Sequence, residues 1–411
     1  MVVEHVGQQI QELRVVRGLG QAELAEGLGV DVSAICNIEK GRRSVKTEEL
    51  VLLARQLGVS PMAILEPESF VGKLSVAARH AGSATVPKVS RKLFEFADLH
   101  QLLAEDGISA PTVSDLLFSP PQKITYESVA ELAEKVSQAL GEWDGRNRFE
   151  RLAQAVEASL GVDVAVEDLG KGELPGAAIT EREFPLILVN SAYPLTHSLF
   201  TLAHEIGHIV LSPSGGFVVD PDHKSRGSDA ERFANYFAAS LLMPADRMRT
   251  MIDKDSVALS LVEIASTFEV SYLSLVYRLH NLGMINAQGR DQLLEIGWHG
   301  ILDEAKRFDG SLPESVRGWA TEVALRHRPG DRPPRHLSTR AVEAFKRGYI
   351  SAAVLSQLTF VSEDELWAEY FEEVSLAKDA DEMSLSKDVI QYPDLPFFPD
   401  EEFEDTAQSP V

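Results

Sequence analysis

Apolar residues recur at helical spacing in five short runs over the first 65 residues. The runs are "HVGQQIQELRVVRG", "QAELAEGLG", "VSAICNIEKG", "KTEELVLLARQLG" and "SPMAIL". Each run ends at Gly or opens with Ser or Thr, which are common at helix ends and helix starts. The pattern predicts a compact five-helix domain over residues 1–65.

The pattern changes twice further along the chain. Residues 66–90 lose periodicity and gain small residues, which indicates a linker. Helical spacing returns in 91–160, and three strand-like runs follow, "VDVAVEDL" from 162, "GAAIT" from 176 and "FPLILVN" from 184. Two helical segments come next, "TLAHEIGHIV" and "SDAERFANYFAASLLMP", and the chain stays mostly helical beyond 255. We therefore predict a mainly α fold with a small β-sheet (α+β), with a second domain over 91–290 and a helical C-terminal region over 291–385.

Composition and charge limit the classes of protein. The 411 residues suit two or three domains, and 44% apolar with 25% charged residues is typical of a globular chain. We expect a cytoplasmic protein without membrane contact, because no apolar run approaches the roughly 20 residues of a membrane span and Cys36 is the only cysteine. The net charge is −24, and residues 361–411 carry 16 Asp and Glu against two Lys. Any contact with DNA must therefore be confined to a part of the chain away from this acidic end. The acidic, proline-rich tail at 386–411 is predicted to be disordered.

The stretch "TLAHEIGHIV" has the spacing of a metal site. His204 and His208 are one helical turn apart, so both imidazoles can reach one ion, and Glu205 is close enough to hold a water there. Gly207 costs roughly 1 kcal/mol in a helix and indicates that another segment passes close by. The apolar residues fall on the opposite side of the helix: Leu202, Ile206, Ile209 and Val210.

A catalytic zinc site, which activates a bound water, needs a third protein ligand and one open coordination position. Glu231 shares a helix face with small residues, so its helix can approach closely, and it is our preferred third ligand. Asp229, at the start of the same helix, is the main competitor as third ligand, although it could equally cap the helix. Asp222 and His223 are weaker candidates because they lie in a loop. A His-His-carboxylate set could also hold Mn²⁺ or Fe²⁺.

The segment "QAELAEGLGVDVSAICNIEKG" has the spacing of a helix-turn-helix. Ala25 is placed where the two helices touch, Gly29 makes the turn and Asp31 is placed to cap the second helix. Cys36 is interpreted as a packing or contact residue. The positions expected to be buried are Leu24, Leu28, Val30, Ile35 and Ile38.

Residues 7–64 resemble the lambda-repressor-like (XRE or Cro/C1 type) family, including the continuation "NIEKGRRSVKTEELVLLARQLGVSP". The resemblance implies that the chain binds a double-stranded DNA operator as a homodimer through its second motif helix. Residues implied to face base edges are Val32, Ser33 and Asn37. Residues implied to contact phosphate are Gln21, Arg42 and Arg43. The alternative is a protein-binding module with the same fold.

Residues 125–290 resemble the ImmA/IrrE metallopeptidases, through "FTLAHEIGHIVL" followed by "ERFANYFAASLLMP". The resemblance implies a zincin-like domain in which His204, His208 and Glu231 bind zinc and Glu205 is the general base. It also implies proteolysis of a repressor as the output. The chain has "THSLF" where many members carry an Arg, and "LSPS" where many carry a His. Candidates for an oxyanion donor are Tyr193, Tyr236 and His223, each more readily explained as structural.

Two further helical segments follow the candidate ligands. Residues 260–285 suggest two helices and a turn, but they depart from the DNA-reading pattern, with Glu269 where a turn Gly is expected and Arg278 near an expected buried site. We interpret them as a helical pair that packs beside the peptidase domain. Residues 340–370 suggest another helical pair. Our preferred interpretation of the chain is a DNA-binding regulator with a zinc endopeptidase domain that cleaves a repressor or partner protein. The alternatives are a transcription factor without proteolysis and an antitoxin-type autorepressor that binds a toxin through its C-terminal half.

Overall fold

A computed structural model describes residues 2–16, 19–57, 59, 61–65, 88–105, 107–108, 110–211, 217–218, 229–252, 256–309 and 328–370. The chain divides into two compact units, Met1–Glu363 and Asp364–Val411. The described part of the second unit is helical. Residues 66–87 of the predicted linker and the whole predicted tail at 386–411 lie outside the described residues.

The N-terminal domain has the five predicted helices, α1 (Val2–Val16), α2 (Gln21–Leu28), α3 (Val32–Glu39), α4 (Thr47–Leu57) and α5 (Pro61–Leu65). Gly29 has φ +64°, the left-handed conformation that the tight turn between α2 and α3 requires. Asp31 is the N-cap residue of α3, but its side chain makes no capping hydrogen bond, contrary to its predicted role. Leu28 and Val30 are only partly buried. The fully enclosed core residues include Ile10, Leu24, Ala25, Ile35, Ile38 and Leu53.

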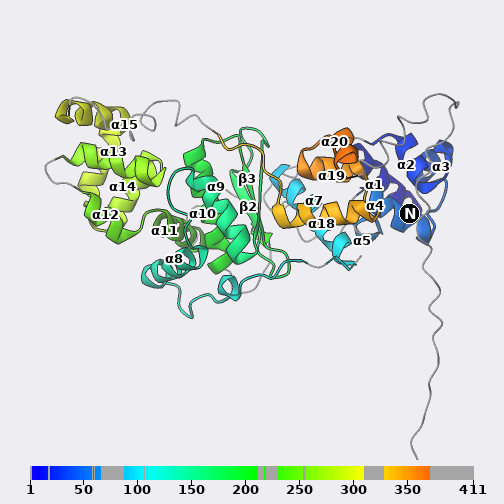
Figure 1. Cartoon of the computed structure of the whole chain (residues 1–411), viewed down its shortest axis with the longest axis horizontal. Helices are drawn as coiled ribbons and strands as arrows, with labels where there is room; N and C mark the ends of the chain where they lie inside the picture. The colour runs from blue at the N-terminus through cyan, green and yellow to red at the C-terminus, as the bar shows by residue number, and fades with distance from the viewer. Residues whose placement is uncertain are drawn as a thin grey trace, which may run out of the picture. The chain divides into compact units, whose positions relative to one another are not determined.

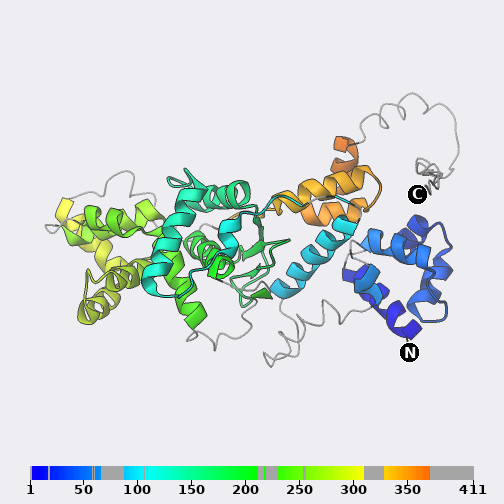
Figure 2. The same cartoon turned by 90° about the horizontal axis from the view of Figure 1, so that it is seen from below.

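A four-stranded sheet of order β1-β3-β2-β4 lies at the centre of the second domain. It comprises β1 (Asp163–Glu167), β2 (Gly176–Ile179), β3 (Leu186–Asn190) and β4 (Phe217–Val218). β1 runs parallel to β3, while β2 is antiparallel to β3 and β4. Every residue of β3 is buried, since α10 covers one face of the sheet and α7 the other (Figures 1 and 2). The prediction of three strands missed β4.

Helices are the main elements in the rest of the described chain, which confirms the mainly α, α+β class. They are α7 (Lys88–Glu105), η1 (Asp115–Phe118), α8 (Tyr126–Leu140), α9 (Arg148–Ala155), η2 (Val156–Leu160), α10 (Leu195–Leu211), α11 (Asp229–Leu242), α12 (Ala245–Met251), α13 (Val257–Phe268), α14 (Tyr272–Asn281), α15 (Ala287–Asp309), α18 (Arg335–Lys346), α19 (Ala352–Thr359) and α20 (Glu363–Tyr370). The segment predicted as a helical pair at 340–370 thus contributes to three helices. Among the described residues no single helix is both long and apolar enough to cross a membrane, and α13 and α14 pass that test only together, with a 108° bend between them.

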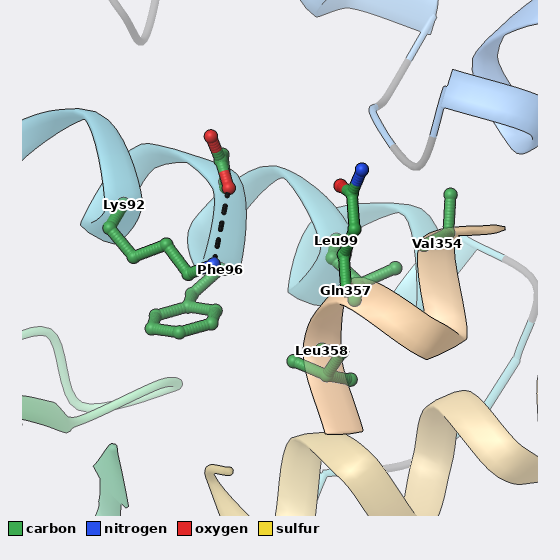
Figure 3. Close-up of a pocket in the computed structure, with 7 residues that line it drawn as sticks. Lys92, Phe96, Leu99, Val354, Gln357 and Leu358 are labelled. Atoms are coloured by element: carbon green, nitrogen blue, oxygen red, sulfur yellow. Dashed lines mark ion pairs between the residues drawn. The ribbon is translucent and has the colours of Figure 1, made fainter. Parts of the chain in front are cut away.

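The described C-terminal helices pack on the sheet through charged groups. The Asp163 carboxylate of β1 accepts hydrogen bonds from the backbone N–H groups of His336 (2.7 Å) and Leu337 (3.0 Å), so it caps α18. Arg332 pairs with the backbone of Val166 and forms a salt bridge with the buried Glu157. A small pocket between α7 and α19 is lined by Lys92, Glu95, Phe96, Leu99, Val354, Gln357 and Leu358 (Figure 3).

The two unexpected residues of the α13–α14 pair have structural reasons. Glu269 takes the turn position with φ +50°, and its carboxylate accepts hydrogen bonds from the N–H groups of Asn147 (3.0 Å) and Arg148 (2.8 Å) at the start of α9. Arg278 is 2% exposed and donates to the Met243 carbonyl and the Ser240 hydroxyl, both at 3.1 Å. These charged side chains therefore join α13 and α14 to α9 and α11. This structural role explains why the pair departs from the DNA-reading pattern.

Candidate metal centre

Helix α10 carries the H-E-x-x-H sequence and is anchored by its apolar side. Its apolar residues Leu202, Ile206, Ile209 and Val210 are all buried. At Gly207 the next helix crosses: a Cβ there would lie 3.1 Å from Phe237 Cδ1 and 3.2 Å from both the Cα and the carbonyl oxygen of Ala234. The close approach indicated by the sequence is therefore present, and α11 provides it.

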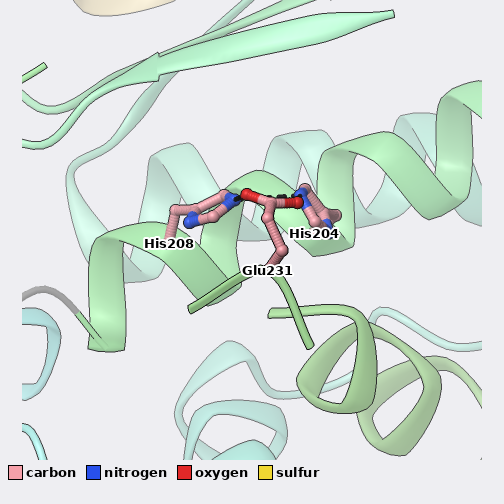
Figure 4. Close-up of side chains that lie close together, drawn as sticks. All are labelled: His204, His208 and Glu231. Carbon is pink, nitrogen blue, oxygen red and sulfur yellow. Dashed lines mark hydrogen bonds and ion pairs between the residues drawn. The ribbon is translucent and has the colours of Figure 1, made fainter. Parts of the chain in front are cut away.

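The crossing of α10 and α11 brings three potential ligands together (Figure 4). His204 Nε2 and His208 Nε2 lie 2.9 Å apart. Glu231 Oε1 is 2.9 Å from His208 Nε2, and Glu231 Oε2 is 3.4 Å from His204 Nε2. Two ligands at about 2.0–2.2 Å from one tetrahedral ion lie about 3.3–3.6 Å apart, so modest adjustment of these side chains would seat an ion.

The surroundings of the cluster favour a charged carboxylate. Hydrogen bonds from His204 and His208 hold the pKa of Glu231 well below its usual range, against the opposing effect of burial. The side chains of His208 and Glu231 are 8% and 16% exposed, so the cluster is largely shielded from solvent. Glu205, next to His204 on α10, is 6% exposed. A deprotonated carboxylate with two imidazoles is a donor set suited to Zn²⁺.

Of the other candidates for the third ligand, the described residue Asp229 does not join the cluster. Asp229 is exposed and forms a salt bridge with Arg232. Asp222 and His223 lie outside the described residues. Among the candidate oxyanion donors, Tyr193 donates its hydroxyl to the Glu173 carbonyl at 2.7 Å. Tyr236 packs its ring under the Arg278 guanidinium.

The residues predicted to contact DNA fall into two groups. Val32, Ser33 and Asn37 on α3 and Arg42 after it are all exposed. The remaining two are already engaged: the Gln21 amide donates to Glu39 Oε2 at 2.7 Å, and Arg43 forms a 2.6 Å salt bridge with Glu49.

Two buried polar groups were missed from the sequence. Glu39 also accepts Arg14 Nε at 2.6 Å, so it joins α1, α2 and α3. Asn190 is fully buried at the end of β3, where Oδ1 accepts from Leu169 N and Ala192 N, and Nδ2 donates to Gly170 O and Leu174 O. The one available indication was a lone amide closing the apolar run "LILVN".

Comparison with known proteins bears on both domains. Residues 157–280 match the family model "IrrE N-terminal-like domain", and residues 10–64 match the model "Helix-turn-helix". The chain combines these two domains. The IrrE N-terminal-like domain contains the His204, His208 and Glu231 cluster, and the helix-turn-helix domain contains α2 and α3.

Two curated relatives are similar to part of the chain. The "Radiation response metalloprotease IrrE" of Deinococcus radiodurans is 34% identical over 104 residues, which are 24% of this chain and 32% of that protein. The protein of the same name from Deinococcus deserti is 32% identical over 104 residues, 24% of this chain and 37% of that protein. The chain thus spans about a third of the length of these relatives.

A likeness to a solved structure is much weaker. The structure of Bacillus thuringiensis PlcR in complex with the peptide PapR7 and DNA aligns over 92% of this chain and 98% of that chain, at 12% identity and a TM-score of 0.17. A TM-score this low supports no inference about the present chain.

Proposed function

We propose that the chain is a DNA-binding transcriptional regulator whose IrrE N-terminal-like domain is a zinc-dependent endopeptidase. The observation that carries the proposal is the convergence of His204, His208 and Glu231 from two crossing helices. Glu205 directly follows His204 on α10. Four protein ligands would suit a purely structural zinc site, whereas three ligands and a neighbouring carboxylate suit catalysis. The family description and the names of the two relatives support the same conclusion.

Each residue has a role in peptide hydrolysis. His204, His208 and Glu231 would hold the metal, and Zn²⁺ when bound acts as a Lewis acid and lowers the pKa of water toward about 7. Glu205 accepts the proton of the attacking water and delivers it to the leaving amine. The low exposure of Glu205 excludes bulk water from competing for that proton.

The N-terminal domain would bring this activity to an operator. Val32, Ser33 and Asn37 would face base edges in the major groove, and Arg42 would contact phosphate. Gln21 and Arg43 are paired with Glu39 and Glu49, so a contact with phosphate would require each side chain to share or leave its present partner. We expect the chain to bind an inverted repeat as a homodimer.

The substrate is proposed to be a repressor or another protein bound at the same operator, so that cleavage relieves repression. The chain's own segment 66–90 is a second candidate site of cleavage. The proposal is restricted to the class of substrate, because the chain covers about a third of its named relatives.

Metal analysis tests the ligand set. We expect about one zinc per wild-type chain, and loss of most of it in His204→Ala, His208→Ala and Glu231→Ala. Asp229→Ala is the matched control, since Asp229 is on the same helix but pairs with Arg232. Glu205→Gln should keep the zinc. Full metal content in Glu231→Ala with loss in Asp229→Ala would move the third ligand to Asp229.

DNA binding is tested on the full chain with a selected operator. Asn37→Ala should relax preference at one base pair by roughly 1–3 kcal/mol, whereas Arg42→Ala should weaken binding to all sequences alike. Failure of the full chain to select any operator sequence would favour a protein-binding role for the N-terminal domain.

A further inference from the structure

Helix α10 packs closely against β2 at Gly176, the first residue of that strand. A Cβ at this position would lie 2.5 Å from Thr201 Cγ2, 3.0 Å from the Leu188 carbonyl oxygen and 3.6 Å from Glu205 Oε1. The first distance is one that real Cβ atoms do not adopt, so any side chain at 176 requires the helix or the strand to move.

The strand is not free to move. Gly176 faces Val189 in the antiparallel ladder, and the Asn190 N–H donates to the Pro175 carbonyl at 2.8 Å. The Asn190 side chain holds the carbonyls of Gly170 and Leu174 in the loop that leads into β2. These bonds hold the beginning of β2 in place.

The helix must therefore yield. Thr201 is β-branched and 6% exposed, so its methyl group has little room to rotate away. Glu205 follows Thr201 by one helical turn on the same side of α10. A displacement of Thr201 consequently shifts the Glu205 carboxylate.

We propose that Gly176 is a positioning residue for the general base: the missing side chain sets the depth at which α10 rests on β2, and thereby the place of the Glu205 carboxylate. This inference rests on the proposed peptidase function. His204 and His208 lie on α10 and Glu231 lies on α11, so a shift of α10 also moves two of the three ligands relative to the third.

Four variants of the full chain test the role: Gly176→Ala, Thr201→Ser, the double variant and Glu205→Gln. Thr201→Ser removes Cγ2, the atom that a Cβ at 176 would strike, and keeps the hydroxyl. Gly330→Ala is the matched control, because a Cβ there meets nothing within 4 Å. Each zinc-loaded protein is measured for zinc affinity and for affinity to acetohydroxamic acid, a probe that binds zinc and shares a proton with an adjacent carboxylate.

We expect Gly176→Ala to lose about tenfold in zinc affinity and, once loaded with zinc, to lose about 10- to 100-fold in acetohydroxamate affinity, since small displacements of a catalytic group are costly. Glu205→Gln should show a similar loss. The double variant should recover most of the wild-type affinity, and Gly330→Ala and Thr201→Ser should match wild type. With a cleaved protein in hand, kcat should follow the same order while KM changes little.

Three results would overturn the inference. The first is wild-type acetohydroxamate affinity in Gly176→Ala. The second is a loss in that variant that Thr201→Ser does not reverse. The third is a wild-type chain that holds no zinc, which removes the metal site and the positioning role together. A wild-type chain that binds zinc and acetohydroxamate but cleaves no protein contradicts the proposed function alone.

Discussion

Gly207→Ala tests whether the crossing of α10 and α11 is as tight as the ligand cluster requires. In a helix interior this substitution ordinarily stabilises a protein by about 1 kcal/mol. Here the new Cβ would lie 3.1 Å from Phe237 Cδ1 and 3.2 Å from the Ala234 Cα and carbonyl oxygen. Two of these three atoms are backbone and cannot rotate away, so the helices must separate by a few tenths of an ångström.

The balance of these effects predicts destabilisation. Overpacking of a close contact costs about 1–3 kcal/mol, which offsets the gain in helix propensity and leaves a net loss of about 0–2 kcal/mol. The separation also moves Glu231 away from His204 and His208. Metal sites tolerate ligand shifts of about 0.2 Å, so we expect zinc affinity to fall about tenfold, or about 1.4 kcal/mol.

Urea denaturation of the zinc-free protein measures the change in the free energy of unfolding. Competition with a chromophoric chelator measures the change in zinc affinity. Gly289→Ala in α15 is the matched control, since its Cβ would meet neighbours only at 3.5 Å or more, and we expect it to stabilise the protein. The reasoning is refuted if Gly207→Ala gains stability as Gly289→Ala does and binds zinc as tightly as wild type.

Two further predictions concern carboxylates away from the cluster. Burial raises the pKa of Asp163 to about 6 from 3.8. Between these two values the folded state binds a proton that the unfolded state does not, so the contribution of Asp163 to the free energy of unfolding increases as the pH falls from 7 toward 4. Urea denaturation at pH 7 and pH 5 should therefore show wild type gaining roughly 1.3 kcal/mol relative to Asp163→Asn. An unchanged difference contradicts the prediction. Glu269→Gly removes the conformational cost of a non-glycine residue in the left-handed region, which is about 1 kcal/mol. It also removes two charge-assisted hydrogen bonds to the start of α9, each of which stabilises the fold by about 1.5–3 kcal/mol. Thermal unfolding should thus show a lower midpoint for Glu269→Gly, and a higher midpoint would mean that a turn glycine is preferred there.

The sequence predicted the features that repeat along the chain. Helical spacing of apolar residues located α10 and α11, because each helix buries one side against a continuous core. The same spacing placed His204, His208 and Glu231 on facing surfaces. Gly207 indicated the crossing itself, since a costly residue in a helix needs a packing reason.

Features that depend on distant partners were not predictable in the same way. β4 has only two residues in the sheet and pairs with a strand almost 40 residues earlier, so no local alternation marks it. Asp31 lies at the start of α3, yet its rotamer does not cap the helix. Asn190 and Glu269 look like ordinary polar residues until the loop or helix that each holds is placed beside it.

The central claim is that Glu205 beside the zinc ligands hydrolyses a peptide bond. New protein N-termini can be identified by mass spectrometry after zinc-loaded chain is incubated with a lysate of its source organism. We predict a specific cleavage with wild type that disappears with Glu205→Gln, while Glu205→Gln retains about one zinc per chain and wild-type operator binding. The same cleavage with Glu205→Gln, or no cleavage by a zinc-loaded wild-type chain, would contradict the claim.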